Sequence, residues 1–598
     1  MKKSTLGALT CAGILSLFFV VAALPAQNIF DPAWGEVAKD VRPVVEESMK
    51  DSLVTGLSIV VVDGNKVVWS EGFGYADAAA EKRADADTMF EIGSISKTFT
   101  GLMVMQLVEE GKIDIDRPVS DYIPAFKMGP TARNFPRNDR PITVRDMMAH
   151  HSGIPGDLLH GAFATAQDPG FNDTLLAWLA EDSATYPPGH RWSYSNTAVS
   201  LLEDVIEAAS GRDFVEYSQE FLTSLGMVPA SFFKTDPALM ARLSKAYDDG
   251  EELPTTFINV PASGSIVASA NHIGLYLRML IAKGSLDARR IVRPETLATM
   301  LSKQYPGNAL GAGLDMGLSF ILSDAELAYA GPLFWHNGAT LAFRSHLEVL
   351  EDQKLGVFVV ANSTSGGGAV EKIAKAALVS ALKHKRGLAK PEAPALAALE
   401  RIALPISFLE NFAGVYVNDD RSRYEIFSPS EGGLSWHTGP AGESGSLKDN
   451  GMLSLWSDGL FRLSADSHFG FEFKEAEGSF IFVVHAGLSQ VIFGERFAPK
   501  PISAAWKARL GTWVAVDPDP NDLGVTMGEI PECSLRESDG LMVLTTTESV
   551  FVLEPISDSV AAIRGLGRFG GTSMRAVEGK EGKEVLRFML VTYGKAAE

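Results

Sequence analysis

Residues 90–97 form the segment FEIGSISK, from which the fold and the chemistry can be inferred. Directly after it, apolar residues recur at helical spacing, which predicts an amphipathic helix that Gly111 ends. Three residues make almost one helical turn, so Ser94 and Lys97 face the same way. Ser94 would lie at the N-terminus of that helix, where free amide groups favour negative charge on a reacting oxygen. A serine hydroxyl needs a base beside it to act as a nucleophile, and a buried lysine that loses its proton can be that base.

The same Ser-x-x-Lys pattern occurs twice more, at residues 231–234 and 380–383. Residues 235–237 read TDP, which cannot open a long helix. Ser380 lies near the end of its predicted helix, where the helix dipole would disfavour an oxyanion. The pattern at Ser94 is therefore the one that predicts a nucleophile.

Two polar triplets follow in the same region, at residues 194–196 (YSN) and 336–338 (HNG). Next to a lysine, the phenol of Tyr194 can pass the serine proton to a leaving group. Asn196 is expected on the same side of an extended loop, where it can bond a substrate carbonyl. A glycine in a strand lets a substrate backbone approach closely, and His336 supplies a hydrogen-bonding group that titrates near neutral pH. Both triplet patterns also occur elsewhere in the chain, so neither is specific by itself. What supports these two copies is that they follow the Ser-x-x-Lys motif in order within one region.

The surrounding region, residues 36–385, alternates between strand-like and helix-like periodicities. Residues 57–62 read LSIVVV, a mostly β-branched run, and the Asp-Gly pair that follows predicts a hairpin. Residues 356–362 read GVFVVAN and predict a late buried strand, followed by a helix over 369–382. Strands at both ends with helices between them predict an α+β domain whose terminal strands share one sheet.

Together, these motifs resemble those of the serine β-lactamase and penicillin-binding protein superfamily, over roughly residues 40–385. Matching stretches also lie at residues 147–154 (MMAHHSGI), 186–189 (YPPG) and 261–265 (PASGS). The resemblance is strongest to the branch that holds class C β-lactamases, D-aminopeptidases, D-specific carboxypeptidases and carboxylesterases. It implies an antiparallel sheet flanked by helices, beside a helical subdomain, with the active site at their junction.

By this resemblance, Ser94 is the acylated nucleophile, and Lys97 and Tyr194 handle its proton. The backbone amides of Ser94 and Ala339 form the oxyanion hole. The other residues implied to act at the site are the catalytic His336 and the substrate-binding Asn196, Asn337 and Gly338. No metal or organic cofactor is implied, and the adjacent histidines at 150–151 lack the spacing of a metal-binding helix.

One position departs from the pattern of many β-lactamases and cell-wall transpeptidases, which use a lysine in the strand motif to grip a carboxylate. Here that position is His336, which is expected to be a weaker and pH-dependent grip. The difference lowers the expectation of efficient β-lactam hydrolysis and fits the peptidase and esterase branches better.

The C-terminal third of the chain changes character. Residues 386–404 are predicted to be a linker, since they contain prolines and many alanines. Beyond them, residues 412–417 (FAGVYV) and 510–515 (LGTWVA) open two similar halves of short strand-like runs. We expect two all-β, lipocalin-like barrels, over 405–498 and 499–598, in preference to one larger barrel. This layout is similar to that of D-aminopeptidases, whose C-terminal modules reach toward the active site and limit what enters.

Residues 1–26 are predicted to be an export signal. Lys2 and Lys3 precede an apolar run over 6–24, and cleavage is expected after Ala26. An uncleaved membrane anchor is the alternative, because the run is almost long enough to span a bilayer. The mature chain is thus expected in the periplasm or outside the cell, with no stable membrane insertion after cleavage.

Composition narrows the function classes. The chain of 598 residues has 53 Lys and Arg against 74 Asp and Glu, a formal net charge of −21. This balance disfavours nucleic acid and anionic lipid as partners. Cys11 and Cys533 are the only cysteines, which excludes a disulfide framework and a thiolate metal cluster.

These observations predict an exported serine hydrolase that works through an acyl-Ser94 intermediate, without metal or cofactor. A D-amino-acid-specific peptidase or amidase is the first hypothesis, with a small peptide, amide or ester as substrate. The alternative within the superfamily is a carboxylesterase or weak β-lactamase. The alternative of another class is a penicillin-recognising binding or sensor protein with negligible turnover. The sequence predicts no oligomeric state.

Overall fold

The computed structural model describes residues 28–596 of the chain, with gaps. The gaps are 132, 134, 136–139, 159, 309, 311–313, 392–398, 419–422, 440–446, 477, 487–488, 524–530, 548 and 581. The predicted export signal lies outside the described residues, and the predicted linker lies partly outside them. Within the described ranges, no helix is long and apolar enough to cross a membrane.

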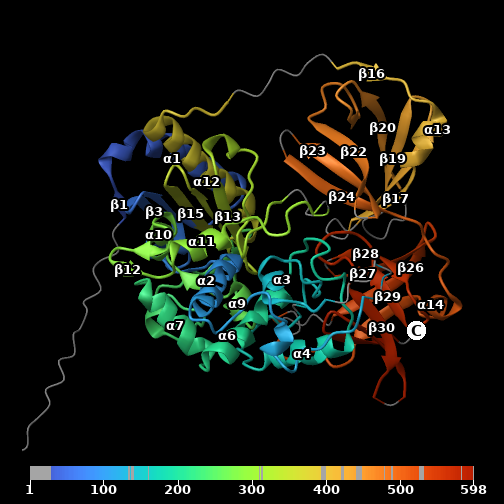
Figure 1. Cartoon of the computed structure of the whole chain (residues 1–598), viewed down its shortest axis with the longest axis horizontal. Helices are drawn as coiled ribbons and strands as arrows, with labels where there is room; N and C mark the ends of the chain where they lie inside the picture. The colour runs from blue at the N-terminus through green and yellow to red at the C-terminus, as the bar shows by residue number, and fades with distance from the viewer. Residues whose placement is uncertain are drawn as a thin grey trace, which may run out of the picture.

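An antiparallel sheet forms the centre of the N-terminal domain, in the order β1-β3-β2-β15-β14-β13 (Figure 1). Its central pair is β2 (Gly56–Asp63) and β15 (Leu355–Ala361), with Val60 opposite Phe358. The other strands are β1 (Ile29–Phe30), β3 (Lys66–Asp77), β14 (Arg344–Leu350), β13 (Leu333–Ala339) and the short β4 (Lys82–Arg83), which pairs with β3. The prediction that the terminal strands of this region share one sheet is confirmed.

Helices cover both faces of the central strands, and this is why those strands read as unbroken apolar runs. Val61 packs on the side of α1 (Gly35–Asp51) and α12 (Gly367–Ala381). Val60 points the other way, toward α10 (Ala270–Ile281) and the helical subdomain (Figure 1). Successive side chains in a strand alternate between faces, so a strand buried on both faces needs no polar position.

The helix predicted after Ser94 is α2 (Ser96–Glu109), which lies between the sheet and the helical subdomain (Figure 1). Phe99 of α2 stacks on Tyr276 of α10, with 3.8 Å between the ring centroids. The expectation of an amphipathic helix is wrong, because α2 is buried on nearly all of its sides. Core packing from every direction therefore holds the segment that follows Ser94.

The remaining helices of the catalytic domain connect the two halves of the sheet. They are α3 (Val144–Met148), α4 (Phe171–Glu181), α5 (Asn196–Ser200), α6 (Leu202–Ser210), α7 (Phe214–Ser224), α8 (Pro237–Met240), α9 (Pro261–Gly264) and α11 (Pro294–Met300). Most of them gather around α2 and form the helical subdomain (Figure 1).

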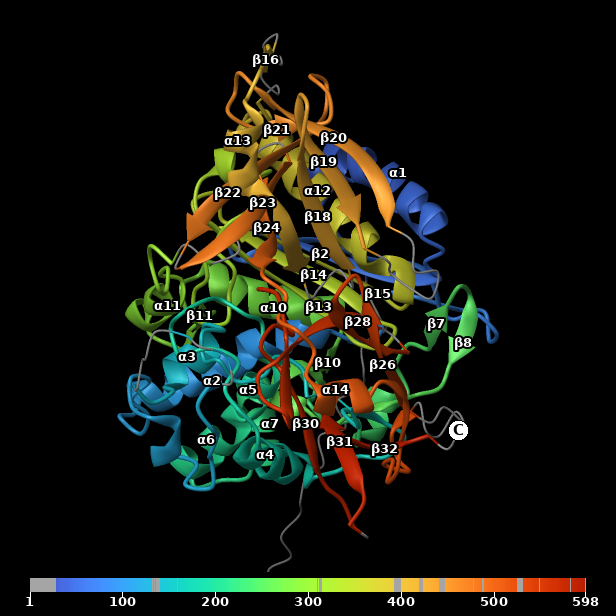
Figure 2. The same ribbon diagram turned by 90° about the vertical axis from the view of Figure 1, so that its right-hand side faces the viewer.

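Two closed antiparallel barrels follow in the described chain, so the preference for two barrels over one is confirmed (Figure 2). The first is closed by β17 (Gly414–Asn418), β18 (Arg423–Ser430), β19 (Gly433–Thr438), β20 (Lys448–Trp456), β21 (Phe461–Arg462), β22 (Phe469–Ala476), β23 (Ser479–Ala486) and β24 (Ser489–Phe497). The second is closed by β25 (Gly511–Ala515), β26 (Glu532–Ser538), β27 (Leu541–Thr546), β28 (Val550–Pro555), β29 (Val560–Ile563), β30 (Ser573–Glu578), β31 (Glu584–Phe588) and β32 (Val591–Lys595).

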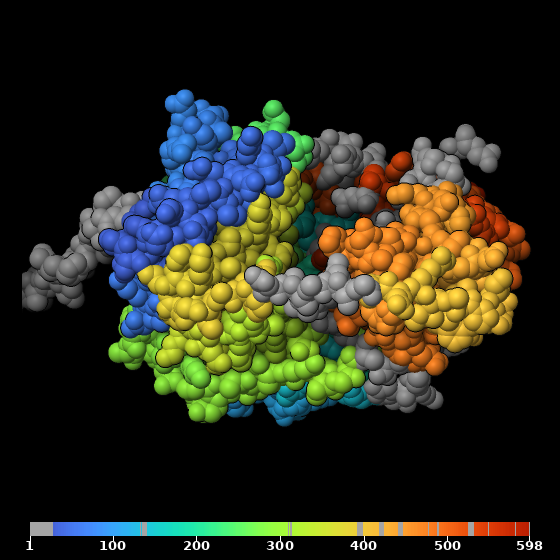
Figure 3. All heavy atoms as spheres, turned by 90° about the horizontal axis from the view of Figure 1, so that it is seen from above, coloured from blue at the N-terminus to red at the C-terminus, as the bar shows by residue number. Residues whose placement is uncertain are grey.

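The second barrel docks on the helical subdomain, and the first barrel sits on the second (Figures 1 and 2). Arg575 of β30 pairs with Asp182 of the catalytic domain at 3.5 Å. Tyr424 of the first barrel packs in one cluster with Val543 of the second. Seen from above, a hollow separates the first barrel, in orange, from the catalytic domain (Figure 3). Of the two barrels, the second is thus the one that contacts the helical subdomain, which borders the predicted site.

Candidate active site

Ser94 lies in a tight 3-10 turn, Gly93–Ile95, that joins β5 (Phe90–Glu91) to α2. Gly93 has a φ of +55°, which an L side chain rarely adopts. The turn places Lys97 in the first turn of α2, fully buried, with its Nζ 3.0 Å from Ser94 Oγ. The predicted pairing of these two side chains is present in the structure.

Two oxygen atoms other than the serine oxygen hold the Lys97 amine. Its Nζ donates to Asn196 Oδ1 at 2.6 Å and to the Ser263 carbonyl oxygen at 2.6 Å. Burial lowers the pKa of Lys97 well below its usual value, so the neutral amine is favoured. A neutral amine has two N–H groups, and both are used by these oxygens. Its lone pair is left facing the Ser94 hydroxyl, where it can accept the proton.

Tyr194 lies beside the same two groups. Its ring centroid is 5.0 Å from Lys97 Nζ. Burial raises the pKa of Tyr194, and a hydrogen bond with Ser94 opposes that rise. The phenol is therefore protonated at neutral pH, so it can relay a proton between neighbours but is poorly suited to act as a phenolate base.

Asn196 takes a different role from the one expected for it. It begins α5 rather than lying in an extended loop, because the Ser195 hydroxyl caps that helix by accepting from the Ala198 amide. Its Oδ1 holds Lys97, and its Nδ2 donates to Asp157 Oδ1 at 2.8 Å. Asn196 therefore orients the lysine, and the second N–H of its amide can still donate to a substrate carbonyl.

The strand motif lies on β13, with His336 and Gly338 on the face toward the helical subdomain. A Cβ on Gly338 would overlap the Ile92 carbonyl oxygen, and one on Gly93 would lie 2.6 Å from the Ala339 amide nitrogen. The glycine thus serves the contact between β13 and the Ser94 turn, not the approach of a substrate backbone as expected. This contact places the Ala339 amide beside Gly93, the residue before Ser94, which is compatible with an oxyanion hole made by the Ser94 and Ala339 amides.

Asn337 lies on the opposite face of β13 and is exposed there. Its side chain therefore does not share the face of His336 and Gly338, and its substrate-binding role stays a prediction. The period of two in a strand is the signal that could have shown this, since His336 and Gly338 share the other face.

His336 is neutral, and the expectation of a pH-dependent grip is wrong. Burial lowers its pKa to about 3. Its Nδ1 lies 2.6 Å from the Asn337 carbonyl oxygen, which can only accept, so Nδ1 carries the proton. Nε2 is then an acceptor, and it is buried with no partner among the described residues. The ring centroid lies 6.2 Å from that of Tyr194, so this acceptor belongs to the same site.

Three side chains near the site were missed by sequence reasoning. His150, in one of the matching stretches, lies 4.4 Å from Tyr194 between ring centroids and accepts from the Ser195 amide at 3.1 Å. Burial lowers the pKa of His150 well below its usual value, so it too is neutral. Asp157 lies beside Asn196, and Arg568 lies beside Tyr194.

Among the described residues, no group of His, Cys, Asp or Glu could hold a metal ion.

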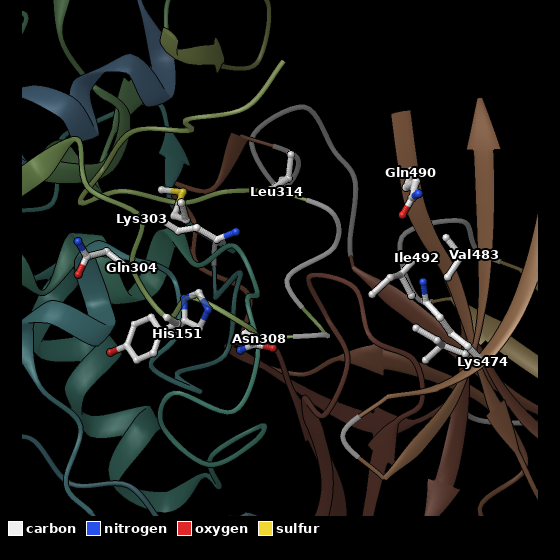
Figure 4. A pocket seen from close by; sticks show the side chains of 12 residues that line it. His151, Lys303, Gln304, Asn308, Leu314, Lys474, Val483, Gln490 and Ile492 are labelled. Atoms are coloured by element: carbon white, nitrogen blue, oxygen red, sulfur yellow. The ribbon is translucent and has the colours of Figure 1, made fainter. Parts of the chain in front are cut away.

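A separate cleft lies between the catalytic domain and the first barrel (Figure 4). It is lined by His151, Lys303, Gln304, Tyr305, Asn308, Leu314, Met316, Lys474, Ile481, Val483, Gln490 and Ile492. His151 stacks on Tyr305 at 4.2 Å between ring centroids, whereas His150 lies beside Tyr194. Ser94, Lys97 and Tyr194 are not part of this lining, so the cleft is distinct from the catalytic group.

Comparison with known proteins assigns a family to the domain that contains Ser94, Lys97 and Tyr194. A family model described as Beta-lactamase matches residues 41–381. Protein flp of Staphylococcus aureus (strain COL) is 30% identical over 199 residues, which are 33% of this chain and 39% of that protein. The chain thus spans well under half the length of the staphylococcal relatives it matches. The D-alanyl-D-alanine-carboxypeptidase/endopeptidase AmpH of Escherichia coli (strain K12) is 26% identical over 375 residues, 60% of this chain and 91% of AmpH.

Two solved structures share the fold. An octameric penicillin-binding protein homologue from Pyrococcus abyssi aligns over 77% of this chain and 99% of its own, with a TM-score of 0.51 and 23% identity. SurE aligns over 78% of this chain and 100% of its own, with a TM-score of 0.55 and 23% identity.

Proposed function

Because the chain belongs to the beta-lactamase family, we propose that it is a serine hydrolase that forms an acyl intermediate on Ser94. Its preferred substrates are small amides with a D-residue on the acyl side, as a D-aminopeptidase would take. We further propose that residues 1–26 direct it out of the cytoplasm.

In the acylation step, neutral Lys97 takes the Ser94 proton as Oγ attacks the substrate carbonyl carbon. The amides of Ser94 and Ala339 stabilise the negative oxygen of the tetrahedral intermediate. Tyr194 passes a proton to the leaving nitrogen, the C–N bond breaks, and Lys97 returns the proton to Tyr194. In the second step, water attacks the acyl carbon, and its proton returns to the serine oxygen by the same groups.

The proposed substrate class follows from the neutral state of His336. An unpartnered Nε2 acceptor suits a substrate amine or amide N–H, whereas a substrate carboxylate would meet no cation at this position. This supports amides with a free or acylated amine over β-lactams and peptides that are recognised by a terminal carboxylate. The printed name of AmpH, which acts on D-alanyl-D-alanine, supports a D-residue.

Release of p-nitroaniline from D-alanine p-nitroanilide tests this proposal, with L-alanine p-nitroanilide beside it and Ser94→Ala as the blank. Faster turnover of the D-substrate that depends on Ser94 is the expected result. Equal turnover of both isomers would overturn the D-specificity. Ser94-dependent cleavage of a p-nitrophenyl ester without any amide turnover would favour an esterase, which the neutral His336 also tolerates. Labelling by a fluorescent penicillin at one equivalent, without turnover of any substrate, would favour the sensor hypothesis.

We expect kcat/KM to fall as the pH decreases, because protonated Lys97 cannot accept the Ser94 proton. The Lys97 pKa is lowered by burial, so activity is present above the lowered pKa and is lost as the pH drops through it. His336 is not the group that titrates, since its pKa is about 3. A pH–rate profile of the wild type and of His336→Asn checks this, and both should show the same acidic limb. A profile that stays flat down to about pH 4 would contradict the role of Lys97.

A further inference from the structure

A loop of the second barrel enters the catalytic domain beside the active site. Residues 564–572 connect β29 to β30. The buried Arg191 donates to the loop carbonyls of Gly565, Gly567 and Gly570, at 3.4, 3.2 and 3.1 Å. Three bonds from one guanidinium hold the loop backbone in a single place.

The tip of this loop touches the segment that carries Asp157. A Cβ on Gly156 would overlap the Arg568 carbonyl oxygen and would lie 2.7 Å from the Tyr194 carbonyl oxygen. Gly156 also accepts from the Asn196 amide through its own carbonyl, at 2.8 Å. The backbone of the second barrel thus packs directly against the backbone of the site.

A continuous series of polar contacts runs from the loop to the serine. Arg568 donates from Nη2 to Asp157 Oδ1 at 2.7 Å and pairs through Nε with the other carboxylate oxygen. The same Oδ1 accepts from Asn196, whose carbonyl oxygen holds Lys97 against Ser94. The Arg568 guanidinium carbon also lies 5.1 Å from the centroid of the Tyr194 ring.

We propose that Arg568 is a positioning residue of the active site: it fixes Asp157 and, through Asn196, the direction in which the Lys97 amine faces Ser94. The C-terminal barrel is then a structural part of the catalytic apparatus as well as a neighbour of it. The proposal rests on the proposed acyl-Ser94 hydrolase function.

Charge supports the geometric argument. Asp157 is only 8% exposed, so its carboxylate needs a cation. Without Arg568, the next basic group along the series is Lys97, and the Asp157 carboxylate would favour its protonated form. The groups that face Lys97 are Arg568, Asp157, Tyr194, His150 and His336, and burial keeps both histidines neutral. Arg568 lowers the Lys97 pKa, and Asp157 raises it.

Four variants of the full-length chain test the proposal by pH–rate profiles with a p-nitrophenyl ester, and Ser94→Ala supplies the blank. Arg568→Met removes the bidentate pair and the charge, and Asp157→Asn removes the carboxylate but keeps its shape. Arg568→Lys keeps the charge alone. Arg575→Ala is the matched control, because it removes another arginine that joins the second barrel to the catalytic domain by pairing with Asp182.

We expect Arg568→Met to lower kcat by about 10- to 100-fold with a smaller change in KM, because Lys97 is no longer held in place. Its acidic limb should move to higher pH, by about half a unit or more, and that of Asp157→Asn to lower pH. Arg568→Lys should keep the wild-type limb with a reduced kcat. Arg575→Ala should keep the wild-type limb and activity within about twofold.

Three results would overturn the proposal. The first is a wild-type kcat in Arg568→Met. The second is a loss of kcat in Arg568→Met that is no greater than the loss in Arg575→Ala, together with an acidic limb that has not moved from its wild-type pH. The third is a limb that moves in the same direction in Arg568→Met and Asp157→Asn. If Arg568→Met does not fold, Arg568→Lys and Asp157→Asn decide the question by the same two readouts. Ester cleavage that persists in Ser94→Ala would instead show that the proposed function is wrong.

Discussion

Replacing Lys97 by methionine is expected to lower kcat/KM for a p-nitrophenyl ester by about 10³- to 10⁴-fold. Methionine has a similar length and no proton-accepting nitrogen, so the substitution removes the base and spares the packing of α2. The Ser94 hydroxyl then keeps its proton, because the neutral phenol of Tyr194 cannot accept it at neutral pH. Steady-state kinetics with the ester and with D-alanine p-nitroanilide measure the loss.

The control for this prediction is Lys383→Met, which changes the lysine of another Ser-x-x-Lys pattern at an exposed position. It should retain wild-type activity. The double variant Ser94→Ala, Lys97→Met should be no slower than either single variant, because residues that act as a unit are not additive. Multiplicative losses, or turnover in Lys97→Met within tenfold of the wild type, would show that another group is the base.

Replacing Gly338 by alanine is expected to abolish at least about 99% of the activity and to destabilise the fold by about 2–3 kcal/mol. The added Cβ would overlap two atoms that cannot easily move, the Ile92 carbonyl oxygen and Ser345 Oγ. To make room, β13 must shift away from the Ser94 turn. The Ala339 amide and the His336 ring shift with it. Urea unfolding and ester kinetics on the same preparation measure the two effects.

Gly368→Ala is the matched control, since no atom lies within 4 Å of a Cβ built there and the residue lies in α12. Alanine in a helix should raise the free energy of unfolding by up to about 1 kcal/mol and leave the activity unchanged. A Gly338→Ala protein as stable and active as the wild type would mean that β13 and the Ser94 turn are not held together in this way.

Much of the framework could be predicted because its signals are local. The apolar runs of β2 and β15 predicted buried strands, and their places at the two ends of one region predicted a shared sheet. The Ser-x-x-Lys spacing placed Ser94 and Lys97 on one side of α2, since three residues are almost one turn. The faint repeat at residues 412–417 and 510–515 predicted two barrels rather than one.

The errors came from patterns whose meaning depends on surroundings. A helix is amphipathic only where one face meets water, and α2 is enclosed by the sheet and the subdomain. The glycine at 338 was correctly read as a site of close approach, but the approaching backbone is that of Ile92. Asn337 lies on the other face of β13 from His336, so its part in the site stays a prediction that rests on the motif.

The residues that could carry the chemistry were predictable from the sequence alone, because the nucleophile, its lysine and the tyrosine lie in short motifs with fixed local geometry. The ionisation and the orientation of those groups depend on tertiary packing. Desolvation lowers the pKa of Lys97 and of His336, and desolvation depends on everything packed around them. The contact of Arg568 with Asp157 joins positions 411 residues apart, and no local pattern records such a contact because it forms only when the second barrel docks.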